Sequence, residues 1–266
     1  MIYLTSIIKK QTYYDTSSYP FSVEVVNNLD QLEFKEPITL LCGGNGCGKT
    51  TLMEILACKT NAIRVNAVFQ ESTKTNSIIQ AENVFRISMK RPARKNFYFS
   101  GEEFIKYIEW VENTKQESRR ALKEIEDTYE KGSYAAKLAS LPHLDTLESL
   151  NGMYASSLAK ESHGEGFIDF FQNRLIKGGL YLLDEPEAAL SYENQYALSI
   201  MIMEAVDDGC QFIISTHSPV IARIPEAAIY HISEGKIQSS YYEELDNIRF
   251  LKLFMQQGER MFSRII

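Results

Sequence analysis

Short, continuous apolar runs recur along the chain, and runs of this length predict strands that are buried on both faces of a parallel sheet. Four runs show the pattern most clearly: Ile38–Cys42, Gly179–Leu183, Cys210–Ser215 and Ala228–Ile232. Five further segments show a weaker strand pattern and are also expected to form strands. They are Met1–Lys10, Phe21–Val26, Ala62–Phe69, Phe97–Phe99 and Lys236–Tyr242.

A second pattern, with apolar residues three and four positions apart, predicts helices between these strands. Such helices are expected over Lys49–Lys59, Tyr192–Val206 and Glu244–Ile266. The longest pattern starts at Glu102 and continues to Lys131, with charged residues filling the gaps between apolar ones. It therefore predicts a long amphipathic arm.

The arm opens a helical segment that interrupts the alternation of strands and helices. Leu141-Pro142 is expected to interrupt the helix, Leu144–Leu158 to form a weaker one, and Ser162–Gly166 to break the chain before a helix resumes over Phe167–Leu175. We therefore predict an α/β fold whose mixed or parallel sheet is flanked by helices. Residues 1–101 and 176–266 would form its core, and residues 102–175 a helical insertion.

Composition narrows the class of protein. The net charge of −7 argues against a surface coated with cations for non-specific nucleic-acid binding, although Lys90–Lys95 is a local basic loop. No apolar stretch is long enough to span a membrane, and the N-terminus lacks the features of a signal peptide. We expect a cytoplasmic protein. Its four cysteines show no metal-ligand spacing, so neither a structural metal nor a disulfide framework is expected.

The first chemical signal is the stretch Gly43–Thr50, which fits the phosphate-binding pattern G-x-x-x-x-G-K-[ST] in full. A predicted buried strand precedes it and a predicted helix follows. Backbone N–H groups of such a loop cradle phosphates, while Lys49 reaches the terminal phosphates and Thr50 binds Mg²⁺. The predicted nucleotide-binding residues of this loop are Asn45, Gly46, Cys47, Gly48, Lys49, Thr50 and Thr51.

Two more predicted strands end in reactive side chains. The strand Leu180–Leu183 is followed directly by Asp184 and Glu185. In a chain with a phosphate loop, Asp184 is placed to hold Mg²⁺, and Glu185 to polarise the attacking water. His217 follows another buried strand and is placed to contact the γ-phosphate. We therefore predict Lys49, Glu185 and His217 as the catalytic set, with ATP and Mg²⁺ as cofactors.

The order of these motifs resembles that of ABC-type ATPases. Between the phosphate loop and Leu-Leu-Asp-Glu-Pro lies Ser162–Gly166, which looks like the ABC signature motif LSGGQ, with departures at His163 and Glu165. The resemblance implies a P-loop NTPase with an ABC-type core. It also implies that Ser162 and Gly164, together with Glu165, contact the nucleotide of a second subunit.

The stretch Asp184–Ser191 is nearer to soluble RecF/SMC-like ATPases than to transporter subunits. More narrowly, the chain resembles a family of short bacterial predicted AAA/ABC ATPases. The residue that would correspond to the Q-loop stays open between Gln70 and Glu102. Tyr19 and Phe21 lie at a plausible distance for stacking on adenine, but core packing is the favoured interpretation.

The resemblance implies a homodimer with ATP at its interface, which hydrolysis opens to switch a partner. The partner would be an effector protein or a nucleic acid, for instance in phage defence or DNA repair. Two alternatives remain: the ATP-binding subunit of an ABC transporter, and a non-catalytic ATP sensor. The presence of both Glu185 and His217 argues against the sensor.

Overall fold

The computed structural model of this 266-residue chain describes residues 1–10, 14–64, 77–79, 81, 83–130, 132–153 and 163–262. For residues 151–153, 163–165 and 259 it describes the backbone alone. Of the candidate site residues named above, Gln70 and Ser162 lie outside this part of the chain. The last residues of the segments predicted over 62–69, 144–158 and 244–266 lie outside it as well.

A seven-stranded sheet forms the centre of the fold, with the strand order β10-β9-β3-β8-β7-β6-β4. All neighbouring pairs are parallel except the hairpin of β9 and β10. The predicted mixed sheet is thus confirmed. The strands are β3 (Ile38–Gly43), β4 (Ile63–Arg64), β6 (Asn96–Ser100), β7 (Leu180–Asp184), β8 (Gln211–Thr216), β9 (Ala228–Ser233) and β10 (Lys236–Ser239).

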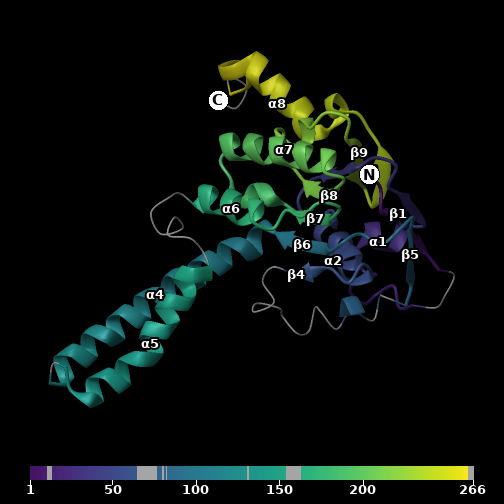
Figure 1. Cartoon of the computed structure of the whole chain (residues 1–266). Coiled ribbons are helices and arrows are strands. Elements are labelled where there is room, and N and C mark those ends of the chain that lie inside the picture. Colours follow the sequence, from purple (N-terminus) through teal and green to yellow (C-terminus); the bar gives the residue numbers. More distant parts are fainter. Residues whose placement is uncertain are drawn as a thin grey trace.

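A smaller antiparallel sheet, in the order β2-β1-β5, lies beside the large one (Figure 1). Its strands are β1 (Leu4–Lys9), β2 (Gln31–Glu33) and β5 (Phe85–Met89). Gln211 joins β1 to the start of β8, because its side-chain oxygen accepts from the N–H groups of Tyr3 and Leu4. Its amide also donates to the carbonyl of Leu4.

Successive residues of the central strands pack into two different cores, as the period of two in a strand requires. Leu41, Leu182 and Ile213 face the core that contains the small sheet and α2 (Lys49–Lys59). Their neighbours Leu40, Leu183 and Ile214 face the other core. That second core is covered by the base of α4 (Gly101–Thr128), α6 (His163–Gln172) and α7 (Tyr192–Asp207).

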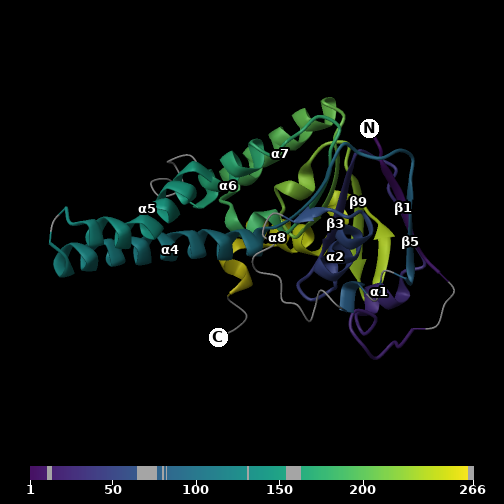
Figure 2. The same cartoon turned by 60° about the horizontal axis from the view of Figure 1, so that its bottom comes forward.

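A helical arm projects from the body in both views (Figures 1 and 2). It consists of α4 and α5 (Tyr134–Met153), which pack side by side along the arm. Ser100 caps α4 by accepting from the N–H of Glu103, and the buried Phe104, Ile108 and Val111 fix its first turns on the core. The predicted amphipathic helix is confirmed. The chain closes with α8 (Asp246–Gln257). Among the described residues, no helix is long and apolar enough to cross a membrane.

Three predictions of secondary structure are wrong. The segment predicted as a strand over Phe21–Val26 instead leads into helix α1 (Glu24–Asn28). Its alternation is short, and Phe21 and Val25 also share the four-residue spacing of a helical face, so tertiary packing decides the outcome. Pro142 does not interrupt α5. It is exposed, so water can solvate the carbonyl that a proline in a helix leaves without its N–H partner.

The break expected at Ser162–Gly166 is also wrong from His163 onward, because α6 already begins there. Phe167, Phe170 and Phe171 are fully buried and hold this helix against the core. The division of the chain into residues 1–101, 102–175 and 176–266 stays a prediction.

Candidate nucleotide site at the carboxyl edge of the sheet

The chemically active side chains meet where four parallel strands end. In the sheet register, Cys42 of β3 lies opposite Thr216 of β8, while Asp184 of β7 lies between Ser215 and Ser100. Because the carboxyl ends of parallel strands lie at one edge, the segments that follow them share one site. This edge therefore brings together the phosphate loop, the acidic turn and the loop of His217.

The phosphate loop is shaped by glycines at special backbone positions. Gly48 precedes α2 with a φ of 95°, and a Cβ there would lie 2.5 Å from a Val25 methyl group. Gly43 is equally enclosed, since a Cβ would lie 2.6 Å from the carbonyl oxygen of Ile232. The turn between them, with Asn45 and Gly46, is exposed. The loop thus combines a tightly packed base with a free outer turn, as a backbone cradle for phosphate requires.

Lys49 has a complete set of acceptors although it is buried. Its Nζ donates to the carbonyls of Gly43 at 2.9 Å and Gly44 at 3.0 Å, and lies 3.0 Å from Glu185 Oε1. An ammonium group has three donors, so each finds one partner. A phosphate oxygen that approached Lys49 would displace one of them. Glu185 is the one acceptor held on a side chain, and it can turn away.

Asp184 is a carboxylate whose burial opposes ionisation. Burial raises the pKa of Asp184 to about 6, although hydrogen bonds from Ser215, Thr50 and Tyr98 counteract this rise. Ser215 Oγ donates to Oδ1, and Tyr98 OH donates to Oδ2 at 3.3 Å. Each of these three hydroxyl groups favours the charged form.

The oxygen donors at this point fit Mg²⁺. A carboxylate and a hydroxyl group beside a phosphate cradle are the ligands this ion takes, the remaining positions being filled by phosphate oxygens and water. In the described part of the chain, no cluster of three His, Cys, Asp or Glu side chains could hold a metal by itself. Thr50 and Asp184 would contribute one hydroxyl and one carboxylate to such an ion.

Glu185 is held in an unusual backbone conformation. Its φ of 45° lies in the left-handed region, which a residue other than glycine rarely adopts. The N–H of Glu185 donates to the carbonyl of Ser215 at 3.0 Å and lies 3.2 Å from its Oγ. On the other side, Gly101 packs so closely that a Cβ there would lie 2.3 Å from the carbonyl oxygen of Glu185. Such conformations persist only where the surroundings enforce them.

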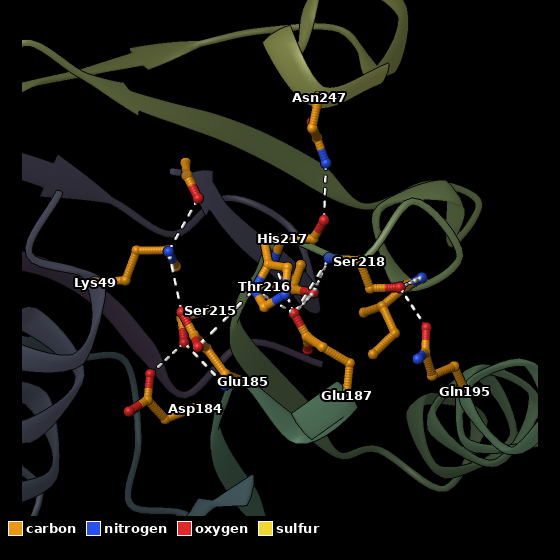
Figure 3. Close-up of polar contacts among 12 residues, drawn as sticks. Lys49, Asp184, Glu185, Glu187, Gln195, Ser215, Thr216, His217, Ser218 and Asn247 are labelled. Atoms are coloured by element: carbon orange, nitrogen blue, oxygen red, sulfur yellow. Dashed lines mark hydrogen bonds and ion pairs between the residues drawn. The ribbon is translucent and has the colours of Figure 1, made fainter. Parts of the chain in front are cut away.

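His217 lies beside two carboxylates (Figure 3). Its Nδ1 is 3.9 Å from Glu185 Oε2 and 3.2 Å from Glu187 Oε1, and the ring is 47% exposed. The amide of Asn247, on α8, donates to the carbonyl of His217 at 2.7 Å. The structure thus brings Lys49, Glu185 and His217 together.

Of the predicted signature residues, Gly164 and Glu165 are in the first turn of α6, where the backbone alone is described. Ser162 lies outside the described residues. Of the two Q-loop candidates, Gln70 lies outside the described residues. Glu102 is in the first turn of α4, directly after the strand that pairs with β7, and is exposed.

The two aromatic candidates for adenine stacking differ. Phe21 is buried and stacks on Phe85, so it belongs to the core, as the favoured interpretation held. Tyr19 donates to Glu54 at 3.1 Å, and burial raises the pKa of its phenol to about 12. Neither residue shows an arrangement specific to adenine.

Two family models match the chain: an AAA domain over residues 20–149 and an AAA ATPase domain over residues 167–222. The first spans the phosphate loop, and the second spans the acidic turn and His217. By its fold and these two matches, this chain is a P-loop ATPase. No curated protein matches the sequence significantly.

Solved structures similar to this ATPase include the Smc head domain from Pyrococcus furiosus, with 11% identity and a TM-score of 0.44 over 96% of this chain and 99% of that one. An ATP-binding cassette of an ABC transporter in its ADP conformation has 16% identity and a TM-score of 0.48 over 97% and 100%. The cassette cbiO1 from Clostridium perfringens has 14% identity and a TM-score of 0.42 over 100% of both chains.

Sequence reasoning missed the residues that hold the predicted ones in place. Tyr98 and Ser215 bind Asp184, and Gly101 packs on the backbone of Glu185. These contacts leave no local sequence signal, because each joins separate strands or helices. Glu187 had a visible signal, since it is the third carboxylate in Asp184–Glu187.

Proposed function

We propose that this ATPase binds ATP with Mg²⁺ at the carboxyl edge of its sheet and hydrolyses the terminal phosphate. The observation that carries the proposal is the 3.0 Å contact between Lys49 Nζ and Glu185 Oε1. The contact supports one site that contains both the phosphate-binding lysine and the candidate base, next to Asp184 at the end of β7. When bound, Mg²⁺ would neutralise charge on the phosphates.

The chain's own residues have separate roles in this reaction. The backbone of the phosphate loop holds the β-phosphate, and Lys49 takes up the terminal phosphate as it leaves Glu185. The released carboxylate of Glu185 then orients the attacking water and accepts its proton. Thr50 and Asp184 hold the metal, and His217 binds an oxygen of the γ-phosphate.

We further propose that two copies close head-to-tail around two nucleotides. The support is that Gly164 and Glu165 lie in the first turn of α6, and the unpaired backbone N–H groups of a helix N-terminus suit a phosphate. Ser162, Gly164 and Glu165 of a second copy would then complete the site. Hydrolysis removes the shared phosphate and opens the dimer.

The variant Glu185→Gln tests this proposal. It should bind MgATP and remain dimeric, because the amide cannot accept a proton from water. Light scattering should give twice the mass of the chain with MgATP and the monomer mass with ADP. A variant that stays monomeric with ATP and still hydrolyses it at the wild-type rate would refute both the roles and the dimer. An effector or nucleic-acid partner, a role in phage defence or DNA repair, a cytoplasmic location and the transporter alternative stay predictions.

A further inference from the structure

Glu187 is a buried carboxylate beside the candidate site for which the reaction described above has no use. It lies in the 3-10 turn Pro186–Ala189, directly after Glu185, and its side chain is only 4% exposed. Burying a carboxylate is unfavourable unless its surroundings compensate for the lost hydration. The position of Glu187 therefore calls for an explanation.

One oxygen of Glu187 organises the loop that carries His217 (Figure 3). Its Oε1 accepts from Thr216 Oγ1 at 2.7 Å, from the N–H of His217 at 2.7 Å and from the N–H of Ser218 at 3.1 Å. Glu187 thereby ties the acidic turn to the end of β8. The backbone at His217 cannot move relative to the acidic turn without breaking these bonds.

The other oxygen lacks such partners. Glu187 Oε2 is buried and makes no hydrogen bond within the described part of the chain. The negative charge of Glu187 is therefore only partly compensated by hydrogen bonds, so it can act on a neighbouring group.

The neighbour that this charge reaches is the imidazole of His217. Its Nδ1 faces Glu187 Oε1 at 3.2 Å and Glu185 Oε2 at 3.9 Å, so two carboxylates lie close to one ring nitrogen. A lone pair on Nδ1 would oppose both negative oxygens, whereas a proton there is attracted by both. A neutral ring carries one N–H, so a proton on Nδ1 leaves a lone pair on Nε2.

We propose that Glu187 is a positioning residue, which fixes His217 as its Nδ1–H tautomer and keeps Nε2 free to act at the terminal phosphate. A proton that Nε2 takes up from solvent can then be donated in a hydrogen bond to a phosphate oxygen, while Nδ1–H stays on the carboxylate side. The role at the phosphate rests on the proposed function. The tautomer is a property of the chain alone and can be measured without nucleotide.

The direct test is nitrogen NMR of protein labelled with ¹⁵N-histidine. The chain has four histidines, and His217→Asn identifies the resonances of interest. At a pH where the ring is neutral, wild-type His217 should show the Nδ1–H pattern. Glu187→Gln keeps the size of the side chain and an acceptor oxygen but removes the charge, so the ratio of Nδ1–H to Nε2–H should fall at least about threefold.

Two further variants sharpen this test. Glu187→Ala removes both oxygens and should make Nε2–H the main form, and if it fails to fold, Glu187→Gln alone decides. The matched control is Glu204→Gln on the exposed face of α7, which should leave the pattern unchanged. A wild-type ring that is mainly Nε2–H, or a pattern that Glu187→Gln does not alter, would overturn the proposal.

The second test is a double-mutant cycle in phosphate release. Glu187→Gln should lower kcat at least about fivefold with little change in KM for ATP, because the group acts through His217 rather than by binding substrate. In the His217→Asn background the same substitution should have almost no further effect. Losses that multiply would overturn the positioning role. If the wild-type protein has no turnover, the proposed hydrolysis fails, while the NMR measurement still decides on the tautomer.

Discussion

The contact between Gly101 and Glu185 leads to the most specific prediction about catalysis. Gly101 is the first residue of α4, and the substitution Gly101→Ala would place a Cβ 2.3 Å from the carbonyl oxygen of Glu185 and 3.2 Å from the Cβ of Ala188. Carbon and oxygen atoms that are not bonded approach to about 3.3 Å. The arm and the acidic turn must therefore move apart by about 1 Å.

Such a shift should damage catalysis more than folding. A misplacement of about 1 Å can lower the rate about 100-fold, so kcat should fall between about 10-fold and 100-fold while KM for ATP changes little. Forcing one methyl group into a packed site costs about 1–3 kcal/mol of unfolding free energy. The melting temperature should fall by about 2–4 °C for each kcal/mol.

Steady-state phosphate release and thermal unfolding measure these effects. The control is Glu109→Ala, two turns further along α4 on its exposed side, which should keep both kcat and melting temperature. If Gly101→Ala retained the kcat of this control, the backbone of Glu185 would not be held by α4 as the structure indicates. A rise in KM for ATP without a fall in kcat would equally contradict this prediction.

Two further predictions concern Asp184 and the shared site. The pKa of Asp184 is raised to about 6 from 3.8 in the folded protein, so its ionisation opposes folding as pH rises from about 4 to 6. Chemical denaturation in metal-free buffer measures the free energy of unfolding of both proteins. From pH 4 to pH 8, the value for Asp184→Asn should rise relative to that of wild type by up to about 3 kcal/mol. A difference between the two proteins that does not change with pH would contradict the raised pKa. Separately, Lys49→Ala and Ser162→Arg should each be inactive, but mixing them should restore part of the activity, because one site of the mixed dimer has both residues intact. A mixture that stays inactive, although mass measurement shows mixed dimers, would contradict a site built from two chains.

The central fold could be predicted because its signals are local. A continuous apolar run marks Ile38–Gly43 as a buried strand, and the glycine pattern after it marks the start of α2 at Lys49. The three- and four-residue spacing likewise marks α4. In each of these elements, pattern and burial agree.

The remaining structure depends on contacts between distant segments. The residues before α1 fit both a strand and a helix, and the packing of Val23 and Val25 against the phosphate loop at Gly48 decides between them. The same limit applies to the site. The sequence indicates Asp184, Glu185 and His217 by their positions after strands, but the tie between Glu187 and His217 forms only when β7 and β8 lie side by side.

Phosphate release from ATP by the wild-type chain and by Glu185→Gln tests the central claim most directly. The account predicts Mg²⁺-dependent turnover by the wild-type protein and a loss of at least about 100-fold in the variant, because its amide cannot accept the proton of the attacking water. A wild-type chain that releases no phosphate, or a variant as fast as wild type, would contradict the account.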